Sequence, residues 1–283
     1  MKNTYSLPIR LLSAGLLAAA LYSCNKLTDS FQKESSATKY AFQQVTGGTD
    51  SVNIYNCVWL VGDQIVSAAA DSAQHIAVTA AFTDSGTNRV VGVRGFSING
   101  MSLGYNARDS TFYFDYSDSV AYLQEGLDLY GTDVQMKITG SGPGDTVTQA
   151  VYMPKMVNSG GGSFPVGQIN IANNLPLSWT PDAGNASGNV YIKIWYNAKM
   201  SRILNDSTLP ATDTVLTYTV PDNGAYTIDS SDLMKLRPNS YVTMSLGRGS
   251  QATAVLPVSG RKVFYYATSS ESSGPITLIY APR

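Results

Sequence analysis

Apolar residues recur with a period of two along most of this 283-residue chain, between clusters of Gly, Asn, Asp and Ser. Such alternation places apolar side chains on one face of a β-strand, whereas an amphipathic helix has a period near 3.6 residues. The pattern therefore predicts an all-β fold. The segments predicted as strands before residue 140 are 52–61, 76–82, 90–98, 111–116 and 134–139, and 119–129 is predicted as a short helix.

The segment 158–163 is the best candidate for a linker, because it contains three consecutive glycines. Glycine has high backbone freedom and offers no side chain for packing, so a glycine run favours a boundary between domains. We therefore predict two β-sandwich-like domains, at 51–158 and 164–283. The preceding residues 24–50 are polar with few aliphatic side chains, which predicts a flexible tether.

The C-terminal part carries a pattern typical of one sandwich family. Leu175 and Trp179 form a Leu-x-x-x-Trp pattern in an early strand, and a Leu-x-Pro turn at 236–238 precedes Tyr241. This part resembles the fibronectin type III-like and immunoglobulin-like β-sandwiches. The resemblance implies that Trp179 packs in the core and that Tyr241 braces a corner between strands. Additional residues at 198–213 depart from the family pattern and imply a long loop.

The N-terminus has the organisation of an export signal. Lys2 and Arg10 make it basic, and the apolar run of ten residues at 11–20 is too short to cross a bilayer as a helix. The next four residues, Leu-Tyr-Ser-Cys at 21–24, resemble the lipobox of bacterial lipoproteins.

This second resemblance implies a signal peptide at 1–23 and acylation of Cys24 after cleavage. Two or more acyl chains hold a protein stably on a membrane, so we expect a lipid anchor at the start of the tether. In bacterial lipoproteins an Asp after the cysteine often marks retention at the inner membrane, and this chain has Asn25 there. The expected location is the cell envelope at the outer membrane, with the periplasmic and surface faces both open.

The charge and cysteine content exclude two classes of protein. Charged residues make up 14% of the chain, the net charge is −1, and no basic stripe is present, so nucleic acid is not an expected partner. The chain has two cysteines, and acylation of Cys24 leaves Cys57 alone, which excludes a disulfide framework. Cys57 lies in an apolar strand-like run, which predicts a buried, inert thiol.

The usual catalytic motifs have no support in this sequence. His75 is the only histidine, so a His-based zinc site lacks ligands. Ser102 lies in a G-x-S-x-G match, but no helix follows it and His75 precedes it, so we interpret the match as a Gly-rich hairpin. The S-x-x-K match from Ser259 to Lys262 falls in a predicted turn. We predict no catalytic residue, no metal site and no cofactor.

Three acids lie close to aromatic residues in the sequence and leave one enzymatic alternative open. Asp115, Asp118 and Glu125 accompany a run of Phe and Tyr, and such a cluster could bind or cut a sugar. Alternating aromatics on a sheet, with solvated acids at its end, is the structural interpretation of the same residues. The other glutamates are Glu34 in the tether and Glu271 in a Ser-rich segment predicted as a loop.

Aspartate is followed by Ser or Thr unusually often. Of 17 aspartates, 10 have such a neighbour, which resembles the acceptor pattern for O-glycosylation of exported proteins in some Gram-negative bacteria. The same pairs are natural where a turn leads into a strand, because Asp and Ser bond to nearby backbone. The seven pairs that continue with an aliphatic residue or Thr begin at Asp50, Asp71, Asp109, Asp118, Asp145, Asp206 and Asp213.

Together these features predict a lipid-anchored, non-catalytic binding or structural module of the cell envelope. Its expected ligand is a glycan or a surface protein, because the 18 tyrosines can stack on flat sugar faces. One alternative is a carbohydrate-active hydrolase that uses the acids near 115–125. A second is a scaffold subunit of an envelope complex.

Overall fold

The computed structural model confirms the all-β prediction. It describes residues 56–67, 70–82, 92–106, 111–116, 119–157, 165, 167–196, 198, 201–202, 212–273 and 275–282. The predicted signal peptide, the anchor at Cys24, the tether, the glycine run at 160–162 and most of the predicted loop at 198–213 lie outside these residues and stay predictions.

The strands follow the predicted alternation. In chain order they are β1 (Asn56–Ser67), β2 (Ala70–Phe82), β3 (Val93–Ile98), β4 (Met101–Ser102), β5 (Gly104–Asn106), β6 (Thr111–Asp115), β7 (Thr132–Gly140), β8 (Thr146–Met153), β9 (Gln168–Asn170), β10 (Leu175–Ser178), β11 (Asn189–Tyr196), β12 (Thr214–Pro221), β13 (Ala225–Ile228), β14 (Tyr241–Val255), β15 (Lys262–Ser273) and β16 (Ile276–Ile279). Two short helices are described as well, α2 (Val120–Leu127) and α4 (Ser230–Leu233).

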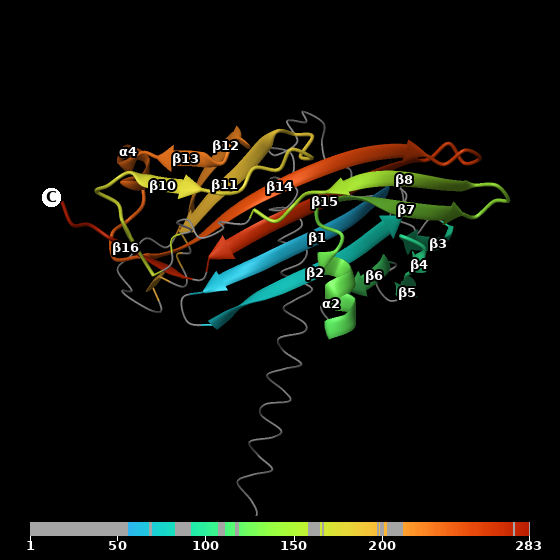
Figure 1. Ribbon diagram of the computed structural model, residues 1–283, viewed down its shortest axis with the longest axis horizontal. Coiled ribbons are helices and arrows are strands. Elements are labelled where there is room, and N and C mark those ends of the chain that lie inside the picture. The colour runs from blue at the N-terminus through green and yellow to red at the C-terminus, as the bar shows by residue number, and fades with distance from the viewer. Residues whose placement is uncertain are drawn as a thin grey trace, which may run out of the picture.

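The described strands form one large sheet and two small ones. The large sheet has ten strands in the order β12-β11-β14-β15-β1-β2-β6-β5, with β16 on β14 and β9 on β16. The small sheets have the orders β4-β3-β7-β8 and β10-β13. In Figure 1 the small sheets lie toward opposite ends of the long strands, with β7 and β8 at one end and β10 and β13 at the other.

The small sheets cover the same face of the large sheet, which we call the inner face. Even-numbered residues of β14 point to this face throughout, because the β14–β15 register contains no bulge. Val242, Met244 and Leu246 pack in the core under β10 and β13. Ala252 and Ala254 pack against the other core, under β3, β7 and β8. The fold therefore has β-sandwich character at both ends of one continuous sheet.

The two cores are not separated by the predicted boundary near residue 160. β1 pairs with β15 in parallel, so strands from both predicted domains are neighbours in one sheet. Val263 and Tyr265 of β15 belong to the same core as Val58 and Leu60 of β1. The linker signal in the sequence is local, whereas β14 is long enough to contribute side chains to both cores.

Local chemistry explains several predicted elements. The predicted helix is α2, and its Ser119 cap accepts a hydrogen bond from the Tyr122 backbone N–H at 3.2 Å. The G-x-S-x-G match is the β3–β4 hairpin, as interpreted from the sequence. Its turn residues Asn99 and Gly100 have φ values of 46° and 86°, which the Asn-Gly pair adopts readily.

The predicted loop around Glu271 is wrong. Glu271 lies within β15, points to the inner face with Ser269 and Ser273, and is 4% exposed. The serines around Glu271 favour the prediction of a loop, because Ser is typical of turns. The sequence does not predict β8, β9, β12, β15 and β16 as individual strands.

Candidate ligand-binding face

The outer face of the large sheet carries an aromatic cluster that is separate from both cores. Its members are Cys57, Trp59, Phe264 and Tyr266 on the central strands β1 and β15. These side chains alternate with core residues such as Val58 and Tyr265, so they point away from both small sheets. The prediction of a buried thiol is confirmed, since Cys57 is 2% exposed and accepts a hydrogen bond from Trp59 Nε1 at 2.8 Å.

Cross-strand register extends this cluster into a row across the outer face. Each residue of the row lies opposite the next one on the neighbouring strand. In order from β14 to β5, the residues are Gln251, Tyr266, Trp59, Thr79, Tyr113 and Gly104. The rings of Trp59 and Tyr266 pack against each other with centroids 4.6 Å apart and planes tilted by 33°. Two strand spacings separate Trp59 from Tyr113, a distance of about 10 Å. We call these six residues the aromatic row.

Tyr113 is the exposed aromatic residue of the row, whereas Tyr266 is buried. The Tyr113 side chain is 41% exposed, and its hydroxyl donates to Asp115 Oδ2 at 3.0 Å, so Asp115 lies on the same face. Gly104 faces Tyr113 across the strand pair, and a Cβ atom there would meet no atom within 4 Å. The tyrosine ring is therefore held by its hydroxyl and bordered by open space.

Of the acids predicted for a hydrolase, the two that the structure describes, Asp115 and Glu125, do not form a pair. Asp115 is on the outer face, whereas α2 packs on the inner side, where Gly126 lies against Tyr116 and Ile76. Burial and the charge of Glu125 on α2 raise the pKa of Tyr116, an inner-face residue, to about 12. Asp115 and Glu125 therefore lie on opposite sides of the sheet, and Asp118 is outside the described residues. A glycosidase needs two carboxyl groups facing one substrate.

The other residues singled out in the sequence are scattered. His75 lies in β2 opposite Asp63, Ser102 is exposed in β4, and Ser259 lies in the turn between β14 and β15. The Ser259 backbone N–H donates to Asp145 Oδ1 at 3.2 Å, which ties this turn to the β7–β8 turn. Among the described residues, no group of three or more His, Cys, Asp or Glu side chains gathers as metal ligands.

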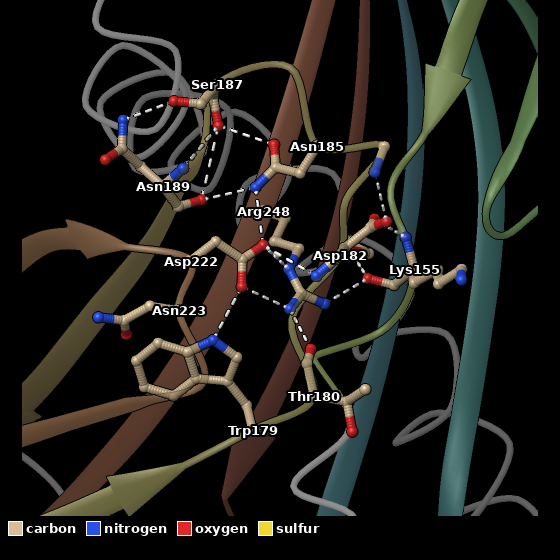
Figure 2. A network of polar contacts seen from close by, with 12 residues as sticks. Lys155, Trp179, Thr180, Asp182, Asn185, Ser187, Asn189, Asp222, Asn223 and Arg248 are labelled. Atoms are coloured by element: carbon tan, nitrogen blue, oxygen red, sulfur yellow. Dashed lines mark hydrogen bonds and ion pairs between the residues drawn. The ribbon is translucent and has the colours of Figure 1, made fainter.

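The best-built polar site lies on the inner face, at the seam between the two cores. Arg248 of β14 is 1% exposed, and its Nε donates to Asp222 Oδ2 at 2.7 Å. Its Nη2 donates to Asp222 Oδ1 and to the Thr180 carbonyl, and its Nη1 donates to the carbonyls of Lys155 and Met156. All five guanidinium N–H groups are therefore used (Figure 2).

Asp222 is the acidic centre of this network. Trp179 Nε1 donates to its Oδ1 at 2.9 Å, and Asn185 Nδ2 donates to its Oδ2 at 3.1 Å. Burial by itself raises the pKa of Asp222, but the hydrogen bonds from Arg248, Asn185 and Trp179 outweigh it and hold the pKa below its usual value. Asp222 is therefore ionised at neutral pH and paired on both oxygens.

Asp182 closes the network on the side of β8. Its Oδ1 accepts from the Tyr152 hydroxyl at 2.8 Å, and its Oδ2 accepts from the Lys155 backbone N–H at 2.8 Å. Burial and the hydrogen bond to Asp182 raise the pKa of Tyr152 to about 12. Because these polar groups bond to one another, the network joins segments of the fold rather than presenting groups to a ligand.

The sequence predicts one member of the network, Trp179, but not its central residues Arg248 and Asp222. The predicted core position of Trp179 is confirmed, since it is 6% exposed in the core under β10 and β13. Tyr241 begins β14 and is half-buried. Arg248 was missed, although it shares the even-numbered face with Met244 and Leu246. A charged residue at an inward position of an alternating strand was the available signal.

Several Asp-Ser/Thr pairs have structural roles. Asp145 is 2% exposed and accepts from the Val258 and Ser259 backbone N–H groups. Asp213 accepts from Trp195 Nε1 at 3.2 Å and from the Ala198 backbone N–H at 2.9 Å. With the Ser119 helix cap, these contacts fit the turn interpretation of the pattern. The pairs at 50, 109 and 206 lie outside the described residues.

In the part of the chain that is described, neither helix has the length and apolar character needed to cross a bilayer. Comparison with protein-family models gave no match to this sequence, and a search of curated proteins gave none either.

Proposed function

We propose that the protein is a lipid-anchored, non-catalytic module of the cell envelope that binds glycan on the outer face of its large sheet. The observation that supports this most directly is the aromatic row, in which Tyr113 is exposed. The Leu-Tyr-Ser-Cys sequence at 21–24 supports the anchor, with Cys24 as the acylated residue. The C-terminal sandwich is proposed to be of the fibronectin type III-like or immunoglobulin-like kind.

The chemistry of the aromatic row suits a sugar. A pyranose ring has an apolar C–H face bordered by hydroxyl groups, so it favours a flat aromatic ring with hydrogen-bonding groups beside it. Tyr113 supplies the ring, while Asp115 and Thr79 supply an acceptor and a hydroxyl next to it. Trp59 lies two strands away, about 10 Å, which is the length of about two sugar units.

The same geometry supports binding rather than cleavage. Asp115 and Glu125 lie on opposite sides of the sheet, so they do not face one glycosidic bond. A single carboxylate beside an aromatic ring can accept hydrogen bonds from sugar hydroxyls without an acid partner.

The test is retardation of the full chain in native gels cast with a panel of polysaccharides, in a detergent that has no sugar head group. We expect retardation by one glycan, and its loss in Tyr113→Ala. Tyr280→Ala is the matched control, because Tyr280 is a 54% exposed tyrosine near the C-terminus. No retardation by any glycan would contradict glycan binding. Shortening of the glycan by the wild-type chain would instead favour the hydrolase.

A further inference from the structure

β12 forms one end of the large sheet and has one open edge. In the described part of the chain, β11 is the strand that pairs with it, and the sheet order ends there. The edge of a sheet presents unpaired backbone N–H and C=O groups, which can bond to another extended chain. In Figure 1, β12 lies at the far side of the sheet from β6 and α2.

The ladder geometry identifies the outward groups. The Asp222 backbone N–H donates to the Gly188 carbonyl at 2.8 Å, one position beyond the pair Asn189↔Pro221. Bonded pairs alternate along an antiparallel ladder, so the even-numbered residues of β12 bond to β11. The odd-numbered residues direct their backbone groups outward. They are Val215, Thr217 and Thr219, and the row ends at Pro221, which has no N–H.

Other edges in the described structure are short or covered. β5 has three residues and β4 has two. β8 has eight, but it packs against β14, where the Ser250 hydroxyl donates to the Tyr152 carbonyl. β10 carries Pro176 among its four residues. Short strands, proline and cover are the devices that keep edges from pairing.

Within the described residues, β12 shows none of these devices over 214–220. It is eight residues long, pairs with β11 without a bulge, and carries no charged side chain. Val215 is 44% exposed. Natural edge strands of this length usually carry a lysine or a bulge that prevents the addition of another strand. An edge strand without these features is therefore suited to pair with a strand of another chain.

We propose that β12 pairs with β12 of a second copy, antiparallel, about a two-fold axis at Thr217. This register places Thr217 opposite itself and Val215 opposite Thr219, so all three outward residues bond. A copy meets no like charge, because the strand is neutral. The bonded pairs carry short β-branched side chains, and Leu216 faces Tyr218 of the copy between them; both kinds of pair suit cross-strand packing. The axis is perpendicular to the sheet, so both aromatic rows face the same side.

The first test is sedimentation of the full chain in density-matched detergent, from dilute solution to its solubility limit. We expect a reversible dimer in the wild type and about tenfold or more weaker association in Thr217→Pro. Proline there removes an outward N–H and leaves the bonds to β11 intact. Thr217→Val keeps the N–H and is the matched control. Thermal unfolding of each variant shows whether it has folded.

The second test fixes the register. In intact cells under mild oxidation, Thr217→Cys is expected to form a disulfide-linked dimer, because the two Cα atoms lie about 5.5 Å apart in a bonded pair. Val215→Cys is expected to form none, since it faces Thr219 of the copy. The wild type controls for Cys57, which is buried.

Three results would overturn the proposal. The first is a wild-type chain that stays monomeric at every concentration. The second is a dimer that a folded Thr217→Pro variant leaves unchanged. The third is cross-linking of Val215→Cys but not of Thr217→Cys. Glycan retardation measured on the monomeric Thr217→Pro chain is independent of all three, so dimerisation and glycan binding can fail separately.

Discussion

The two faces of the large sheet differ in whether their polar and aromatic side chains are buried and bonded within the fold or exposed. On the inner face, Arg248 and Asp222 are buried and each of their hydrogen-bonding atoms has a partner within the fold. On the outer face, Tyr113 is 41% exposed and borders open space at Gly104. The inner face is therefore where changes should alter stability, and the outer face is where they should alter recognition.

This contrast also separates two kinds of evidence for function. A buried polar network resembles a binding site, but a network whose donors and acceptors all bond to one another offers no free hydrogen-bonding group to a ligand. An exposed aromatic ring such as that of Tyr113 can contact a ligand. The difference can be tested by placing matched substitutions on each face.

Arg248→Met should have the largest effect. It leaves the Asp222 carboxylate buried without its ion pair, and removing one partner of a buried pair costs about 3–5 kcal/mol. Urea denaturation at neutral pH measures this loss. Arg248→Met combined with Asp222→Leu should recover much of it, because neither charge of this ion pair remains. Equal destabilisation of the single and double variants would contradict the ion-pair explanation.

Gly62→Ala should come next, at about 1–3 kcal/mol. Gly62 lies on the inner face of β1, and an added Cβ would clash with the Tyr130 hydroxyl and approach Met153 Cε to 2.9 Å. Gly95→Ala is the control, since a Cβ there meets no atom within 4 Å. Comparable unfolding midpoints for the two variants would show that β1 is not tightly covered at this point.

Acid should weaken the inner face through Asp222. Its pKa is lowered in the folded state, so the stability it contributes is present above its unfolded pKa of about 3.9 and is lost as pH falls through the folded value. Urea denaturation from about pH 6 to pH 3 should show a steeper loss for the wild type than for Asp222→Asn. Parallel pH profiles would assign the acid sensitivity to other carboxylates.

Trp179→Phe should have a smaller effect, about 1 kcal/mol. It keeps an aromatic ring in the core but removes the Nε1 hydrogen bond of 2.9 Å to Asp222. The unfolding free energy measures the change, and Trp195→Phe, which removes a hydrogen bond to Asp213 at an exposed site, is the comparison. The inner-face variant should lose more. A reversed order would mean that burial does not strengthen this bond.

Tyr113→Ala should have the smallest effect on stability, within about 0.5 kcal/mol, while abolishing glycan retardation. Gly104→Ala tests the same site from the neighbouring strand, because its methyl group would reduce the open space beside the ring. Both variants should retain the wild-type unfolding midpoint. A large loss of stability in Tyr113→Ala would place that ring with the structural residues of the inner face.

Much of the fold was predictable because its signals are local. The alternation at β7 places Val134, Met136 and Ile138 in the core, and all three are fully buried. The helix at α2 follows from its Ser119 cap, and the β3–β4 hairpin from its Asn-Gly turn. The strand around Glu271 was missed because a serine-rich strand lacks the apolar alternation that identifies its neighbours.

The sequence by itself determined that this chain forms β-strands, and which side chains of most strands point inward, because a period of two is a property of neighbouring residues. Only the tertiary structure decided that β1 pairs with β15, that Arg248 meets Asp222, and that Trp59 and Tyr113 share one row. These pairings join strands that are distant in the chain. Their register depends on how the whole sheet assembles, and no local pattern records it.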